Sequence, residues 1–300
     1  MALHKAQLAL LPSAEFHFVG RDGLRVACAR WDGRKPVRGV VQIAHGMGEH
    51  FGRYVGLIEV LVSEGVTVYA NDHRGHGRTA LSPANFGDFG EGGFDLLVAD
   101  MAHLSDIAKA ENPNLPFILF GHSMGSFAAQ QYVLDRSDKI DGLMLSGSGA
   151  LDELAALVRC VPPGINILNA AFEPARTQAD WLSRDTAVVD AFLRDPLCFP
   201  RLQPSSFAAF LAAAHRLADP TALSGIRSDL PIYLFSGSAD PVGQQLEGVE
   251  TLVRRYRHAG LYDISHDFYR EGRHEMLNEI NRREVLANLL TWLCTQLDRS

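Results

Sequence analysis

The stretch that decides the fold is residues 115–135, which read LPFILFGHSMGSFAAQQYVLD. Residues 115–120 form a short, continuous apolar run, as a buried parallel strand would. Residues 126–135 are predicted to be helical, and between the two stands the pentapeptide Gly121-His122-Ser123-Met124-Gly125. A Gly-x-Ser-x-Gly between a strand and a helix is typical of a nucleophile elbow, a sharp turn that exposes the serine hydroxyl above the sheet.

The residue types at this turn fit that geometry. Gly121 and Gly125 have no Cβ, which allows neighbouring backbone to approach closely. The helix that follows would direct its N-terminal amides toward Ser123, where a developing anion would lie. The alternative, a Gly/Ser-rich loop without a chemical role, does not explain the apolar run before the pentapeptide or Ala128 and Ala129 after it.

The composition is that of a globular protein of 300 residues, 47% hydrophobic and 21% charged, and the length predicts one or two domains. The formal net charge is −7, so we expect no nucleic-acid partner, because such a partner selects a basic face. The cysteines are widely spaced and form no metal-like pair, which indicates free thiols in a reducing compartment. They are Cys28, Cys160, Cys198 and Cys294.

Two apolar stretches could be taken for targeting or membrane segments. Residues 8–11 are too short for the core of a signal peptide and lack a convincing cleavage site. Residues 115–134 carry no charge and are long enough for a membrane span, but the strand, turn and helix explain the glycines and polar residues that interrupt them. We therefore expect a cytoplasmic protein, with peripheral membrane association left open.

Strands and helices alternate along most of the chain, which predicts a mostly parallel sheet covered by helices on both faces. An Asp-Gly pair at residues 22–23 predicts a hairpin between the first two strands. The predicted strands are residues 15–19, 24–30, 39–44, 66–70, 115–120, 142–145, 230–235 and 262–269. The predicted helices are residues 54–63, 94–111, 126–135, 246–258 and 276–297.

The alternation breaks between residues 150 and 227, where no strand is evident. This stretch has a helical composition and is interrupted by prolines, among them Pro162-Pro163-Gly164. We predict that residues 150–227 form an inserted helical cap over the carboxyl edge of the sheet. Residues 1–149 and 228–300 would then form the core domain.

One apolar stripe in the predicted cap has two interpretations. Phe207, Phe210 and Leu211 recur at helical spacing, together with Ala214. The stripe can pack the cap onto the core, or it can line an acyl-chain pocket, since pockets are themselves lined by apolar side chains. The sequence leaves both interpretations open.

A serine hydroxyl is a weak nucleophile until a base takes its proton and an acid orients that base. After a nucleophile elbow these partners follow in the order acid, then histidine, each on a loop at the carboxyl end of a strand. Asp240 follows the strand predicted at residues 230–235, and His274 follows the last strand in a glycine-containing loop. We therefore predict a catalytic triad of Ser123, Asp240 and His274.

Other candidates for the acid and the base are less well placed. Asp152 or Glu153 follows an earlier strand and is the weaker alternative for the acid. His258 is predicted on a helix and His266 inside a strand, where a core or surface role is expected.

The loop His45-Gly46-Met47-Gly48-Glu49-His50 follows the strand predicted at residues 39–44. In a fold with a nucleophile elbow, the loop after this strand supplies one amide of the oxyanion hole. We predict the Met47 N–H for this role, with the Met124 N–H as the second donor. For the polar side chains of the loop we favour stabilisation of the loop by hydrogen bonds over direct catalysis.

A second polar cluster, residues 71–78, contains two histidines and an aspartate. It lacks the ligand spacing of a helix-borne metal site, and a serine nucleophile needs no metal. We interpret it as a turn at the end of a strand, and we expect neither a metal nor another cofactor.

Several motifs recur together in one known group of proteins. They are His45-Gly46-Met47-Gly48-Glu49-His50 with Arg53-Tyr54, Asp72-His73-Arg74-Gly75-His76-Gly77, Gly121-His122-Ser123-Met124-Gly125, Ser183-Arg184-Asp185, Asp195-Pro196-Leu197, Gly237-Ser238-Ala239-Asp240, and His274-Glu275. With these motifs, spread from about residue 16 to residue 293, the chain resembles the monoacylglycerol lipase and lysophospholipase branch of the α/β-hydrolases, a group also described as serine-aminopeptidase-like.

The resemblance implies an α/β-hydrolase fold with an eight-stranded, mostly parallel sheet and a helical cap. It also implies hydrolysis of small acyl esters, of the monoacylglycerol or lysophospholipid type, through an acyl-enzyme on Ser123. Transient contact of the cap with a membrane or a lipid surface fits such substrates. The oligomeric state is not predicted.

Other functions remain as alternatives. A short-chain carboxylesterase would use the same residues, and an aminopeptidase of this fold would need an acidic site for the substrate amine, for which Glu153, Glu173 and Asp180 are candidates. A dehalogenase is disfavoured because its nucleophile is an aspartate. A non-catalytic protein that binds a hydrophobic ligand would usually have lost part of the triad.

Overall fold

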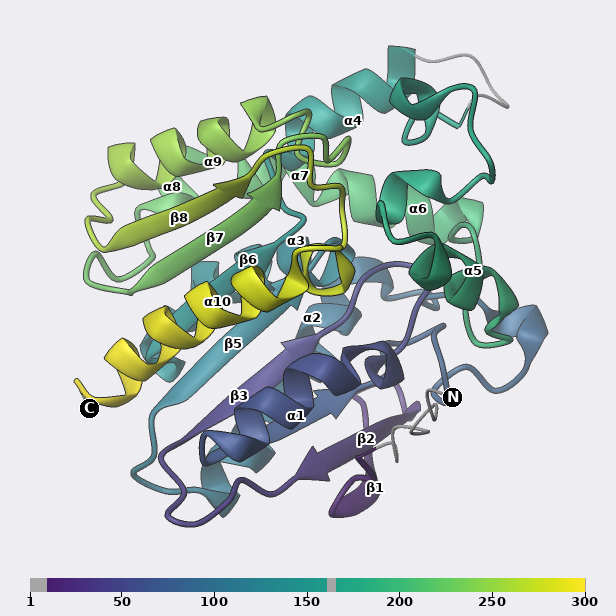
Figure 1. Cartoon of the computed structure of the whole chain (residues 1–300). Helices are drawn as coiled ribbons and strands as arrows, with labels where there is room; N and C mark the ends of the chain where they lie inside the picture. The colour runs from purple at the N-terminus through teal and green to yellow at the C-terminus, as the bar shows by residue number, and fades with distance from the viewer. Residues whose placement is uncertain (1–9, 161–165, 300) are drawn as a thin grey trace, which may run out of the picture.

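An eight-stranded sheet in the order β1-β2-β4-β3-β5-β6-β7-β8 runs through the protein (Figure 1). Its computed structural model describes residues 10–160 and 166–299; the predictions for residues 1–9 and for Pro162-Pro163-Gly164 lie outside these ranges. The strands are β1 (Ala14–Val19), β2 (Arg25–Trp31), β3 (Gly39–Ala44), β4 (Val66–Asn71), β5 (Phe117–His122), β6 (Gly142–Ser146), β7 (Ile232–Gly237) and β8 (Ile264–Tyr269).

Only β2 runs against its neighbours. It pairs antiparallel with β1 and with β4, and every other pairing in the sheet is parallel. The β1–β2 hairpin turns at Gly23, whose φ of 85° lies in the left-handed region that glycine adopts without strain. The predicted mostly parallel, eight-stranded sheet is confirmed.

Helices cover both faces of the sheet, as Figure 1 shows. Helices α1 (Val55–Ser63) and α10 (Arg282–Leu297) pack on one face, where they share a hydrophobic core with β3, β4 and β5. Helices α2 (Gly93–Glu111), α3 (Met124–Arg136) and α9 (Glu247–His258) contribute to the core of the other face. In α2, buried apolar residues recur every three or four positions and join the core on this face of the sheet; they are Phe94, Leu97, Met101, Leu104 and Ala108.

Between β6 and β7 the described residues form helices and turns but no strand. Figure 1 shows several of these elements beyond the carboxyl ends of the strands. The division into a cap of residues 150–227 and a two-part core stays a prediction. The elements are α4 (Leu151–Cys160), the 3₁₀ turns η4 (Ala170–Phe172) and η5 (Asp180–Leu182), α5 (Thr186–Arg194), α6 (Pro204–Ala212), α7 (Ala214–Leu217) and α8 (Pro220–Leu223).

The remaining short turns join the core elements. They are η1 (Phe51–Tyr54), η2 (Pro83–Asn85), η3 (Ser137–Lys139) and η6 (Met276–Asn278). No helix of residues 10–160 and 166–299 combines the length and the apolarity that a membrane span requires. The four cysteines are unpaired, as predicted.

The closing helix was predicted over residues 276–297, and that start is wrong. A separate turn, η6, ends at Asn278, and α10 begins only at Arg282. The cause is Glu279, whose backbone is extended (ψ 166°) and whose carboxylate is fully buried. That carboxylate accepts hydrogen bonds from the main-chain N–H of Arg184 at 2.9 Å and of Arg273 at 3.1 Å. These two contacts, one of them with a residue 95 positions away, draw Glu279 out of the helix.

Candidate active site

Ser123 lies at a strained turn between β5 and α3. Its φ of 52° and ψ of −124° fall in a region that side chains other than glycine rarely occupy. Such strain persists where the surroundings enforce it, and it gathers at functional sites. Here the N–H of Ser123 is held at 2.9 Å by the carbonyl of Ser146, at the end of the neighbouring strand β6. The helix begins at Met124, closer to the serine than the predicted residue 126.

The two glycines of the pentapeptide allow this turn. A Cβ on Gly125 would lie 2.2 Å from the carbonyl oxygen of Ala44, at the end of β3. A Cβ on Gly121 would lie 2.5 Å from the carbonyl oxygen of Gly125 itself. Both distances are far below contact, so the close approach of backbone that we predicted from these glycines is present.

Asp240 and His274 come together from the loops after β7 and β8. His274 Nδ1 lies 3.0 Å from Asp240 Oδ1, and both side chains are buried. The same carboxylate oxygen accepts the N–H of Val242 at 2.9 Å, which orients it. Because a carboxylate only accepts, Nδ1 carries the proton and Nε2 of the imidazole is left for proton transfer.

The pKa of His274 is raised above its ordinary value of 6.5. Burial is the largest influence and lowers the pKa, but the charge and hydrogen bond of Asp240, with the charges of Glu275 and Glu49, together outweigh burial. A base of this kind accepts a proton readily near neutral pH.

His274 packs beside the elbow. Its ring lies 4.7 Å from the ring of His122, the residue before Ser123. Gly147, with φ of 55°, makes room for it, since a Cβ there would lie 2.7 Å from His274 Cε1. No hydrogen bond joins Ser123 Oγ to His274 within the described part of the chain; in enzymes without substrate this contact is often long and tightens on binding.

The alternative acids and bases lie elsewhere. Asp152 forms a two-pronged ion pair with Arg255, at 2.6 and 2.9 Å. His258 is exposed at the end of α9 and His266 is exposed in β8. Of the candidates weighed from the sequence, only Asp240 and His274 are brought together.

The loop predicted to supply an oxyanion amide lies against Ser123. A Cβ on Gly46 would be 3.1 Å from the Cβ of Ser123. Gly46 N–H donates to the buried carboxylate of Glu49 at 2.6 Å, and Tyr54 Oη donates to the same oxygen at 2.5 Å. Loop stabilisation by side chains, the interpretation we favoured, agrees with these bonds. The Met47 N–H follows directly in this loop, and the Met124 N–H belongs to the first turn of α3, whose amides have no partner within the helix.

Arg53 connects this loop to the loop of His274, a role that the sequence analysis missed. Its guanidinium donates to Glu49 at 2.9 Å and, with two nitrogens, to Glu275 at 2.6 and 2.8 Å. All three side chains are at most 10% exposed. Burial is the largest influence on Glu49 and raises its pKa, but the charges of Arg53 and His122 and the hydrogen bonds from Tyr54 and Gly46 together outweigh burial. The pKa is therefore lowered and the carboxylate stays ionised. The signal in the sequence was the presence of Arg53 and Glu275 in the quoted motifs without an assigned role.

The region predicted as a cap also bonds to the loop of residues 45–50, which is predicted to supply an oxyanion amide. Phe199 N–H donates to the carbonyl of Gly48 at 2.9 Å. Gly48 has φ of 72°, and a Cβ there would lie 2.1 Å from the carbonyl oxygen of Phe199. Nearby, His50 Nε2 lies 2.9 Å from Asp195 Oδ2. The loop is therefore held between the core and the segment that follows α5.

Within residues 10–160 and 166–299, one group of side chains could hold a metal ion. The ligand atoms of His50, Asp195 and Cys198 lie within 4.8 Å of one another. However, the Gly52 N–H donates to His50 Nδ1, so the proton sits on Nε2, where a metal would bind, and points to Asp195. Burial raises the pKa of Cys198 to about 12, which keeps it a thiol rather than the thiolate that binds metals. These residues fit a hydrogen-bonded pair better than a metal site.

The apolar stripe of α6 packs the helix onto the core through Phe210. This ring is buried and meets Phe94 of α2 at 5.3 Å and Phe127 of α3 at 5.7 Å, both edge to face. Phe207 and Leu211 are half-buried beside it. A role of these residues in an acyl-chain pocket stays a prediction.

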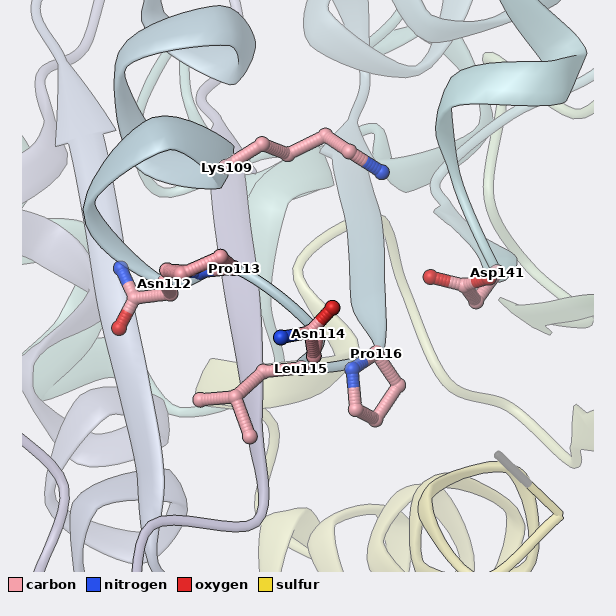
Figure 2. Close-up of a pocket in the computed structure, with 7 residues that line it drawn as sticks. All are labelled: Lys109, Asn112, Pro113, Asn114, Leu115, Pro116 and Asp141. Carbon is pink, nitrogen blue, oxygen red and sulfur yellow. The ribbon is translucent and has the colours of Figure 1, made fainter.

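A cavity of about 310 Å³ lies away from this site. Figure 2 shows it between the end of α2 and the segment that leads into β5, with Asn112 on one side, Asp141 on the other and the Lys109 side chain extending toward the Asp141 side. It therefore lies at the amino end of β5, whereas Ser123 follows the carboxyl end of the same strand. It has no part in the candidate site.

Comparisons with known proteins agree with this architecture. A family model described as "Serine aminopeptidase, S33" matches residues 35–281. A monoacylglycerol lipase of Mycolicibacterium smegmatis is 30% identical over 293 residues, covering 95% of this chain and 98% of its own. A monoglyceride lipase of Mus musculus is 28% identical, covering 88% of each chain. The crystal structure of a carboxyl esterase from Bacillus coagulans in complex with glycerol superposes with a TM-score of 0.87 at 27% identity, covering 96% of this chain and 100% of the esterase. The chain therefore belongs to the serine aminopeptidase S33 family of α/β-hydrolases, the group to which its motifs pointed.

Proposed function

We propose that this chain is a serine hydrolase that cleaves carboxylic esters through an acyl-enzyme. The observation that carries the proposal is the buried Asp240–His274 hydrogen bond of 3.0 Å, placed beside the strained elbow of Ser123. A nucleophile, an orienting acid and a base, in this chain order and each after the carboxyl end of a strand (β5, β7 and β8), are the parts that acyl transfer requires.

In the proposed mechanism, Ser123 Oγ attacks the ester carbonyl while His274 Nε2 takes its proton. The Met47 and Met124 amides stabilise the resulting oxyanion. When the carbon–oxygen bond to the alcohol breaks, His274 gives the proton to the leaving alcohol and the acyl group stays on Ser123. Water, deprotonated by His274, then releases the acid and restores the serine. Asp240 keeps the imidazole in the required tautomer throughout.

For the substrate we propose an acyl ester with a small polar head, of the monoacylglycerol or lysophospholipid type. Relatives that align along nearly the whole chain bear the names monoacylglycerol lipase and monoglyceride lipase, and a phospholipase of Bacillus subtilis is 26% identical. Phe207, Phe210 and Leu211 would line the acyl pocket, and residues 150–227 would contact lipid surfaces as a cap. The alternative is a short-chain esterase that uses the same residues; the preferred acyl-chain length of the substrate distinguishes the two.

The test combines active-site labelling with turnover. A fluorophosphonate probe should label the wild type but not Ser123→Ala, and p-nitrophenyl esters from short to long chain should show an optimum at medium or long chains. Ser123→Ala should lower kcat by up to about 10⁶, the effect seen for serine-protease triads. A loss below tenfold would refute the role of Ser123, and an optimum confined to short chains would make the protein a small-ester esterase.

An aminopeptidase is the second candidate, because the matching family model carries that description. Such an enzyme needs a carboxylate to bind the substrate amine, and the candidates from the sequence are engaged elsewhere. Glu153 lies 3.9 Å from Arg255, Glu173 accepts the N–H of Ala175, and Asp180 accepts from Thr177. Faster turnover of aminoacyl amides than of acyl esters would decide for the aminopeptidase.

A further inference from the structure

Trp181, in the turn η5, packs against the imidazole of His274. The ring centroids are 4.8 Å apart and the planes are inclined by 40°. The indole is half-buried and also contacts apolar residues of two clusters, so it is held by packing and not only by this one contact. Sequence analysis assigned it no role, because nothing in the local pattern connects residue 181 to residue 274.

The main chain holds the two rings together. The N–H of His274 donates to the carbonyl of Trp181 at 3.4 Å, and the N–H of Glu275 donates to the carbonyl of Leu182 at 2.8 Å. On its other side, the N–H of Trp181 donates to Asn169 Oδ1 at 3.0 Å. The indole therefore has a fixed position relative to the imidazole.

The guanidinium of Arg273 strengthens this docking. It donates to the main-chain carbonyl of Asp180, which directly precedes Trp181, and lies 4.3 Å from the centre of the Phe172 ring. Three consecutive residues of η5 are thus tied to three consecutive residues of the loop after β8.

We propose that Trp181 is a positioning residue for His274, whose indole stabilises the imidazolium that forms when the base takes the proton of Ser123. The inference rests on the proposed function. An aromatic ring attracts a cation within about 6 Å of its centroid, most strongly when the ring is Trp and the site is dry. The separation of 4.8 Å satisfies this condition, and the interaction is gained only when the imidazole is charged, which is what a transition state of acyl transfer requires.

Several charged groups surround His274, and the uncharged indole of Trp181 acts beside them. Asp240 faces it from the loop after β7, and Glu275 and Glu49 act on it from the neighbouring loops. Arg53 lies between the two glutamates and offsets their charge. On η5 itself, Asp180 turns its carboxylate to Thr177 and the N–H of Arg176, away from the imidazole.

His122 is the remaining titratable group in contact with His274. Burial, followed by the charge of His274, lowers the pKa of His122 to about 4. His122 therefore stays neutral and does not compete with His274 for the proton of Ser123. Asp240 is then the direct ionic partner of the imidazolium, and Trp181 adds attraction without adding a second charge to a buried site.

The experiment measures the pKa of the His274 imidazole by NMR titration of protein with ¹⁵N-labelled histidine, with His274→Gln to assign its resonances among the twelve histidines. Trp181→Leu should lower this pKa by about half a pH unit, the shift expected from losing a cation–ring contact at a partly exposed site. Trp181→Phe keeps a ring and should stay close to the wild type. The acid limb of the pH dependence of kcat/KM should move in the same direction.

An unchanged or raised pKa in Trp181→Leu would overturn the proposal, because it would mean that the indole acts only by excluding water, which lowers a histidine pKa. Should that variant not fold, trifluorotryptophan incorporated at Trp31, Trp181 and Trp292 preserves shape while weakening the ring's attraction for a cation. The pKa of His274 should then fall, and the same labelling of Trp181→Phe should leave it unmoved. The NMR measurement needs no turnover, so an inactive wild type would refute the proposed function without affecting this test.

Discussion

Arg53 offers the sharpest test of how the site is held together. The change is Arg53→Met, which keeps an unbranched apolar stem and removes the charged guanidinium. The structure places its guanidinium between Glu49 and Glu275, with hydrogen bonds of 2.9, 2.6 and 2.8 Å. Both carboxylates are almost fully buried. In the variant, two negative charges would remain in the interior without their shared partner.

The expected loss of stability follows from that burial. Removing one partner of a buried ion pair destabilises a protein by about 3–5 kcal/mol, because the other charge stays unpaired away from water. Arg38→Met is the matched control, since Arg38 pairs at 2.7 Å with Asp298, which is 70% exposed. An exposed pair of this kind contributes about 0–1 kcal/mol. The difference between the two variants should therefore be several kcal/mol.

The assay is urea unfolding at several pH values, together with kcat/KM. Without the charge of Arg53, burial should raise the pKa of Glu49 above that of the unfolded chain, so protonation of Glu49 favours the folded form. The stability deficit of Arg53→Met should shrink as the pH falls through this raised value. Activity should fall as well, because Glu49 holds the Gly46 N–H beside Ser123. If Arg53→Met costs no more than Arg38→Met, the reasoning about this buried network is wrong.

Three further predictions concern the chemistry. Gly48→Ala should lower kcat by about 10²–10³, because the new Cβ would lie 2.1 Å from the carbonyl oxygen of Phe199 and displace the loop of residues 45–50. Gly23→Ala is the control: its φ of 85° is similar but no atom lies within 4 Å, so this variant should lose stability and keep kcat. The pKa of His274 lies above 6.5, and only the neutral imidazole accepts a proton, so kcat/KM should fall as the pH drops through that raised value. Asp240→Asn should move this acid-side fall to lower pH and reduce kcat about 10⁴-fold. A fall at the same pH as in the wild type would contradict the assignment of Asp240. Phe207→Ala should raise KM for long-chain p-nitrophenyl esters and leave short-chain esters unaffected; equal effects on both would remove Phe207 from the acyl pocket.

The features that could be predicted from the sequence are those that short-range sequence patterns encode. The elbow was recognisable because the apolar run before Gly121, the two glycines and the helix after Ser123 each follow from a short-range rule. The same holds for the strands, whose ends then located Asp240 and His274. Parallel strands place their carboxyl ends at one edge, so residues far apart in the chain could be assigned to one site without knowing any contact.

Contacts that no period or spacing encodes could not be predicted in this way. Arg53 and Glu275 are separated by 222 positions and meet only once β3 and β8 take their places in the sheet. Glu279 lies inside the range predicted for the closing helix. Its buried carboxylate instead accepts main-chain N–H groups of Arg184, 95 positions away, and of Arg273 in the loop after β8. A buried donor without a partner is costly, which favours this arrangement over a longer helix.

In the stretch between β6 and β7, the boundary predicted from the sequence pattern does not coincide with the main-chain hydrogen bonding. The described residues of this stretch, 147–160 and 166–231, form no strand, and the same lack of strand pattern in the sequence led to the predicted boundary between core and cap. Main-chain hydrogen bonds cross that boundary on both sides of Ser123, from Phe199 to Gly48 and between residues 181–182 and 274–275. The loops with the proposed oxyanion amide and the proposed base are thus each held by the inserted stretch. A displacement that broke either set of bonds would disturb the chemistry itself as well as access to it.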